Sequence, residues 1–141
     1  MQSVELDAAD AAELHALFAE YGWWDDRTVS GVRDALAETP LALGLQEDGE
    51  LVAAARVLTD FVYYARVYDV IVAEEYRTEG VGAELLETVV EHPDLSAVNP
   101  VLLCREGLVP FYESAGFEPY PETVAHPEGE DEQLRQLIHT G

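Results

Sequence analysis

The chain has 141 residues, of which 48% are hydrophobic, and this suits one domain (residues 1–141) with a buried core. Its 29 acidic residues outnumber seven basic residues, all of them arginine, so the formal net charge is −22. The absence of lysine excludes a Walker-type phosphate loop, Schiff-base catalysis and a protein kinase site, and the acidity argues against nucleic-acid and membrane-surface partners.

The charge and the single cysteine also predict a setting. Carboxylates at this density repel one another in a compact chain, unless salt near 1 M shortens the Debye length to about 3 Å. A lysine-free, acidic composition resembles that of proteins from salt-accumulating haloarchaea, with an ordinary acidic mesophilic protein as the alternative. Cys104 has no second cysteine to pair with, the first residues are acidic, and no apolar run reaches about 18 residues, so we expect a cytoplasmic protein without a membrane span.

The first half of the chain predicts a short strand, two amphipathic helices and a β-hairpin. Apolar residues at three- and four-residue spacing indicate the helices, while short apolar runs bounded by turn residues indicate the strands. Asp48-Gly49 is a dipeptide typical of a tight hairpin turn. In chain order we expect a strand at 4–6, a helix at 8–21 with Asp7 as its N-cap, a helix at 28–38, and strands at 41–46 and 50–58.

The second half of the chain predicts a strand–helix–strand unit, whose two strands should be parallel. An acidic loop is expected at 128–132, and the segment that follows, 134–139, suits either a last strand or a short helix. The other elements that we expect are strands at 67–73, 101–104 and 117–120 and helices at 80–91 and 108–115.

The most informative stretch runs from the strand at 67–73 into the helix at 80–91, through a turn that carries Gly80 and Gly82. The first N–H groups of a helix lack partners within it and carry partial positive charge, and glycine lets a ligand approach them closely. The stretch therefore predicts a site for phosphate or pyrophosphate that needs no lysine. A dinucleotide fingerprint would have its third glycine at position 85, which is leucine.

Two motifs resemble those of the GNAT N-acetyltransferases. Arg77-x-x-Gly80-x-Gly82, between a strand and a helix, is similar to that family's acetyl-CoA pyrophosphate loop. A Phe-Tyr-x-x-x-Gly-Phe segment at 111–117 is similar to a second motif of the family, and the helix–helix–hairpin start follows the family's order. The resemblance implies an α/β (α+β) fold with a mixed, centrally splayed sheet of about six to seven strands, flanked by about four helices.

The resemblance also implies a reaction, which is direct transfer of the acetyl group of acetyl-CoA to an amine. The acceptor would be a small amine or a protein amine, and the protein would be a monomer or homodimer. Residues 68–72 are similar to a subgroup of small members that includes arylalkylamine-type acetyltransferases. A non-catalytic CoA-binding sensor or partner-binding module on the same fold is the alternative.

The family's cofactor contacts carry over to specific positions of this chain. The pantetheine arm would lie in the gap between the strands that end at Val72 and Cys104, and the pyrophosphate would rest on N–H groups at the start of the following helix. Glu79 departs from the family pattern, because a carboxylate beside a pyrophosphate is unfavourable in dilute buffer. The residues assigned to acetyl-CoA are Ile71, Val72, Arg77, Thr78, Gly80, Val81, Gly82, Ala83 and Phe111.

Tyr112 and Asp69 are the candidate catalytic residues. Tyr112 matches the family's tyrosine that protonates the departing thiolate, although its ring could equally serve packing. Asp69, beside an apolar run, is a candidate general base with a raised pKa, or else a buried structural carboxylate, in which case water relays the proton. Cys104 is expected to be an inert buried thiol, and the scattered histidines predict no metal site. The candidate walls of an acceptor pocket, for which core or surface packing is the alternative, are Trp23, Trp24, Tyr63 and Tyr64.

Overall fold

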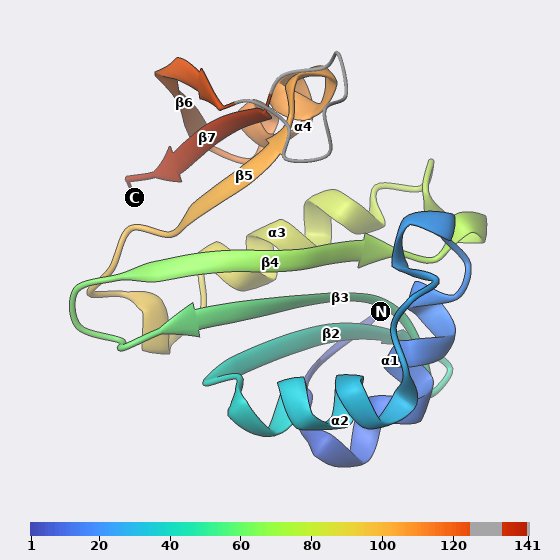
Figure 1. The fold of residues 1–141 in the computed structure, drawn as a ribbon. Helices are drawn as coiled ribbons and strands as arrows, with labels where there is room; N and C mark the ends of the chain where they lie inside the picture. Colours follow the sequence, from blue (N-terminus) through green and yellow to red (C-terminus); the bar gives the residue numbers. More distant parts are fainter. Residues whose placement is uncertain (125–133, 141) are drawn as a thin grey trace.

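The computed structural model describes residues 1–124 and 134–140 (Figure 1). Within them, seven strands form one sheet in the order β1-β2-β3-β4-β5-β7-β6, with four α-helices around it. The strands are β1 (Gln2–Glu5), β2 (Leu41–Glu47), β3 (Glu50–Thr59), β4 (Ala65–Val72), β5 (Val101–Arg105), β6 (Phe117–Val124) and β7 (Leu134–His139). The helices are α1 (Ala11–Phe18), α2 (Val29–Glu38), α3 (Val81–Val90) and α4 (Val109–Ser114).

The sheet is mixed and splays open at its centre. All neighbouring strands are antiparallel except β4 and β5, which run parallel and pair at a single register position, Arg66 with Val101. The two strands therefore touch near their first residues and diverge toward their carboxyl ends, as Figure 1 shows. This confirms the fold class expected from the sequence.

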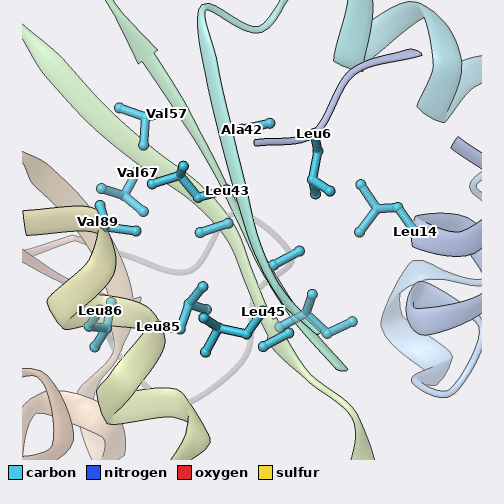
Figure 2. Packing of buried hydrophobic residues seen from close by; sticks show 14 of the residues in the cluster. Leu6, Leu14, Ala42, Leu43, Leu45, Val57, Val67, Leu85, Leu86 and Val89 are labelled. Carbon is cyan, nitrogen blue, oxygen red and sulfur yellow. The ribbon is translucent and has the colours of Figure 1, made fainter. Parts of the chain in front are cut away.

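Helices cover both faces of the sheet at β2 and β3. Leu6 and Leu14 lie on the α1 side, whereas Val67, Leu85 and Val89 lie on the α3 side (Figure 2). Leu85 and Val89 are 0% exposed, and burying a side chain of this size stabilises the fold by about 1.5–3 kcal/mol. These apolar residues, four positions apart in the sequence, therefore lie on the face that α3 packs on the sheet.

The hairpin turn follows the sequence closely. Asp48 and Gly49 have φ values of 52° and 83°, which are the left-handed conformations that a two-residue type I′ turn requires. The last element is a strand, because β7 pairs with β5 on one side and with β6 on the other. The acidic segment at 128–132 lies outside the described residues, and none of the helices described is long and apolar enough to cross a bilayer.

The first helix is shorter than expected. It ends at Phe18, and Tyr21 has an extended backbone with φ −125° and ψ 129°. The Tyr21 hydroxyl donates a hydrogen bond to the Val72 carbonyl at the end of β4, so a contact between distant segments overrides local helical spacing.

Candidate active site

The divergence of β4 and β5 opens a cleft of about 1090 Å³. Its walls come from both strands, from the segment between α1 and α2, from the start of α3 and from α4. The cleft therefore gathers residues from distant parts of the sequence at the point where the sheet lacks a strand ladder. The sequence-predicted site residues that line it are Asp69, Ile71, Val72, Arg77, Thr78, Gly80, Gly82, Ala83, Phe111 and Tyr112.

One wall of the cleft is the bare first turn of α3. Gly80 is the N-cap, with a φ of 78°, and it provides no side-chain hydrogen bond to the turn. Glu84 is the first residue whose N–H bonds back within the helix, to the Gly80 carbonyl at 3.1 Å, so the preceding N–H groups have no helical partner. A β-carbon at Gly82 would lie 3.0 Å from Cζ of Phe111, which means that only glycine fits beneath that ring without displacing it.

This turn suits an anionic group. Its free N–H donors and helix dipole favour negative charge, and no side chain fills the space in front of Gly80. Val81 belongs to the core, at 3% exposed, and does not line the cleft. Glu79 is exposed and also does not line the cleft, so its carboxylate stays outside the wall.

Tyr21 and Arg77 support the end of β4, and sequence analysis assigned no role to Tyr21. The Tyr21 hydroxyl occupies one acceptor position of the Val72 carbonyl, and the guanidinium of Arg77 lies 5.6 Å from the centre of the Tyr21 ring. Burial raises the pKa of the Tyr21 phenol, with Arg77 acting in the opposite direction. The phenol therefore remains protonated and donates its hydrogen bond. The Val72 carbonyl oxygen has one acceptor position left for another donor.

Tyr112 lies deep in the cleft. It is 7% exposed, and its ring meets Phe111 and Phe117 edge-on, at centroid distances of 5.0 and 6.0 Å. Burial raises the pKa of the phenol, and the neighbouring Cys104 thiol adds to the shift when ionised. Tyr112 is therefore protonated at every working pH and can donate a proton to a basic atom in the cleft. Its hydroxyl has no hydrogen-bond partner among the residues described.

Asp69 is clamped by two arginines from other elements. Arg27 donates to both of its carboxylate oxygens, at 2.8 and 3.0 Å, and the Nε of Arg56 donates to Oδ2 at 2.8 Å. The guanidinium of Arg27 also lies 4.6 Å from the centre of the Phe18 ring, and Arg56 donates to the Thr39 hydroxyl at 2.9 Å. The clamp therefore ties the segment before α2 and strand β3 to the middle of β4.

The clamp corrects the expected pKa of Asp69. Burial alone would raise it, but the hydrogen bonds and charges of Arg27 and Arg56 outweigh burial, and the net shift is downward. Asp69 also has a φ of 55° and sits in a β-bulge, since Arg56 pairs with Tyr68 and Ala54 pairs with Ile71. These observations favour the structural carboxylate, the second reading that the sequence left open, and the sequence offered no signal for either arginine partner.

The predicted aromatic walls divide into two groups. Trp23 and Trp24 line the cleft, and Trp24 packs on Phe18 at a centroid distance of 4.9 Å. Tyr63 and Tyr64 are 77% and 78% exposed in the loop between β3 and β4, and they do not line the cleft. Of the four residues predicted to form an acceptor pocket, the two tryptophans line the cleft and the two tyrosines do not.

One group of potential metal ligands lies elsewhere. Glu5, His92 and Asp94 bring one donor atom each to within 4.8 Å of one another, on β1 and on the segment after α3. The Nδ1 atom of His92 already accepts the Asp94 N–H at 3.1 Å, and none of the three residues lines the cleft.

The profile of the Acetyltransferase (GNAT) family matches residues 4–117, and the chain belongs to this family. It is 32% identical over 82 residues to the chloroplastic GCN5-related N-acetyltransferase 2 of Arabidopsis thaliana, covering 56% of this chain and 31% of that protein. It is 31% identical over 118 residues to the uncharacterized N-acetyltransferase ycf52-like of Prochlorococcus marinus, covering 80% of this chain and 65% of that protein. The chain thus spans less than two thirds of these relatives.

The fold also resembles that of solved acetyltransferases. An aminoglycoside 6′-N-acetyltransferase in complex with coenzyme A superposes with a TM-score of 0.79, at 16% identity, over 99% of this chain and 97% of that one. At this identity the likeness concerns the fold alone.

Proposed function

We propose that the protein is an acyl-CoA-dependent N-acyltransferase that transfers the acetyl group of acetyl-CoA directly to an amine. The single observation that carries the proposal is one continuous cleft that holds both the bare N-terminal turn of α3 and the protonated phenol of Tyr112. Family membership supports it, and so does the likeness to a fold solved with coenzyme A. Acetyl-CoA supplies the activated thioester.

The chain's own groups would hold acetyl-CoA at its pyrophosphate and along its pantetheine arm. Backbone N–H groups of Val81, Gly82 and Ala83 would donate to the pyrophosphate, with Arg77 and Thr78 beside it. The diverging edges of β4 and β5 leave backbone groups of Ile71 and Val72 for the pantetheine amides, although Tyr21 already uses part of the Val72 carbonyl. Phe111, whose ring lies against Gly82, would contact the co-substrate between these two regions.

Proton transfer would involve Tyr112 and water. The amine nitrogen attacks the thioester carbon, the C–S bond breaks, and the phenol of Tyr112 gives its proton to the departing sulfur. The amine loses its own proton to water, because Asp69 has a lowered pKa and directs its oxygens at two guanidinium groups. In this proposal Asp69 is a positioning residue. Through its hydrogen bonds with Arg27 it holds the segment that follows Trp23 and Trp24 against the bulge of β4.

We also propose that the protein works at high salt. Glu74, Glu75, Glu79 and Glu84 are all exposed around the turn that would hold the pyrophosphate, in a chain with a net charge of −22. At about 0.1 M salt the Debye length is near 10 Å, so these carboxylates repel one another and an anionic co-substrate. Molar salt would remove most of this repulsion, which agrees with the lysine-free composition.

The proposed function is tested by a thiol-release assay of acetyl-CoA with a panel of amines in molar potassium chloride, with calorimetric titration of acetyl-CoA alongside. Binding together with amine-dependent thiol release is the expected result. Binding without transfer to any amine would favour a non-catalytic CoA sensor on this fold, and no binding at all would contradict the cleft assignment.

A further inference from the structure

The side-chain charges in the described wall of the cleft are mostly positive, whereas the whole chain is strongly negative. Three of the seven arginines, Arg66, Arg77 and Arg105, line it, whereas Asp69 is the one acidic residue among the described residues of its wall. That carboxylate is already paired with Arg27 and Arg56, neither of which lines the cleft. Among the described residues, the wall of the cleft thus carries more basic than acidic side chains, although the chain as a whole is strongly acidic.

Arg66 lies at the end of the cleft opposite the turn of α3. It is near the start of β4, at the position where β4 and β5 still pair, whereas Gly80 and Arg77 follow the end of β4. Arg66 is therefore too far along the strand to serve a pyrophosphate at that turn, although it lines the same cleft.

Among the described residues, the face of β4 on which Arg66 lies is partly exposed. Val67 points to the α3 side of the sheet (Figure 2). Because side chains alternate along a strand, its neighbours Arg66 and Tyr68 point to the opposite side, and Tyr68 is 41% exposed there. The Nη2 of Arg66 donates to Oε1 of Gln136 at 3.1 Å, across β5, where Leu103 is 42% exposed. Arg66 is half-buried, is held by a neutral amide, and forms no ion pair with the residues described.

We infer that the acceptor is an amine that also carries a carboxylate, such as an amino acid, and that Arg66 binds this carboxylate. The inference rests on the proposed acetyl transfer. A guanidinium held by one neutral partner keeps donors for a bidentate carboxylate contact, and Tyr68 and Leu103 offer apolar surface to the rest of the molecule. Polycationic amines are disfavoured, because they would meet Arg66 and find no free carboxylate on the described wall.

The test compares amines that differ by a carboxylate, with acetyl-CoA and in molar potassium chloride. The panel contains the common amino acids and 4-aminobutyrate, each beside its decarboxylated amine, for example phenylalanine beside 2-phenylethylamine. We expect the wild type to prefer the carboxylate-bearing member by about 10- to 100-fold in kcat/KM. Arg66→Gln should abolish this preference, Arg66→Lys should keep part of it, and the exposed helix variant Arg33→Gln should keep all of it.

Acetyl-CoA affinity and melting temperature, measured on the same variants, separate a lost acceptor contact from misfolding. Both should match the wild type in Arg66→Gln. Equal or better use of the decarboxylated amines by the wild type, or an unchanged preference in Arg66→Gln, would overturn the inference and leave acetyl transfer standing. Binding of acetyl-CoA with no amine acetylated would overturn both.

Discussion

Replacing Asp69 by asparagine removes the charge at the centre of the clamp and keeps its shape. The asparagine amide nitrogen would face one of the two guanidinium groups that now meet a carboxylate oxygen, so at least one arginine loses its partner. Removing one partner from a fully buried ion pair costs about 3–5 kcal/mol. The side chains of Asp69, Arg56 and Arg27 are 10%, 17% and 31% exposed, and solvent screening reduces the expected cost to about 2–3 kcal/mol.

The assay is thermal unfolding in molar potassium chloride, where this loss should lower Tm by about 5–10 °C. Asp34→Asn is the matched control, because it makes the same change of charge at an exposed position of α2 and should leave Tm nearly unchanged. An Asp69→Asn protein as stable as the control would refute the clamp.

The pH dependence of stability gives a second check on the clamp of Asp69 by the two arginines. The folded-state pKa of Asp69 is lowered, so its contribution to stability is present above the unfolded carboxyl pKa of about 3.9 and is lost as pH falls through the folded value. The Tm difference between wild type and Asp69→Asn should therefore be full near pH 6 and shrink below about pH 4. A difference that stays constant down to acid unfolding would contradict the pairing.

Two other perturbations address the co-substrate site. Gly82→Asp adds a β-carbon against Phe111 and a negative charge at the bare turn, so calorimetry should find acetyl-CoA binding nearly abolished, with Gly82→Ala intermediate; unchanged affinity would contradict the turn assignment. Raising potassium chloride from about 0.1 M to molar levels should raise Tm and lower the KM for acetyl-CoA together. Glu79→Gln should weaken the salt dependence of KM more than Glu87→Gln, a matched exposed change further along α3, and identical responses would show that Glu79 does not influence the site.

Local chemistry in the sequence was enough to predict the hairpin turn and the strand–turn–helix of the proposed acetyl-CoA site. Asp48-Gly49 predicted its hairpin because the turn depends on two residues alone, and Gly80 and Gly82 indicated a strand–turn–helix whose backbone is open. The splay between β4 and β5 came from the family resemblance, since spacing alone predicts parallel strands and not where they part.

The parts that could not be predicted depend on contacts between distant residues. Asp69 stands 42 positions from Arg27, and nothing in the spacing of either residue indicates that they pair. Tyr21, which local spacing assigns to α1, has an extended backbone and donates a hydrogen bond to a carbonyl 51 positions away. Both contacts join β4 to residues far from it in the sequence. A pattern of neighbouring residues therefore cannot predict them.

The most direct test of the central claim is the rate of acetyl transfer by wild type and Tyr112→Phe, measured side by side with acetyl-CoA affinity and Tm. The substitution keeps the ring that packs against Phe111 and Phe117 and removes the hydroxyl alone. If this phenol protonates the departing thiolate, kcat should fall about 10²-fold or more, while affinity and Tm stay near the wild-type values. A wild-type kcat in Tyr112→Phe would contradict the proposal and leave the residue with a packing role.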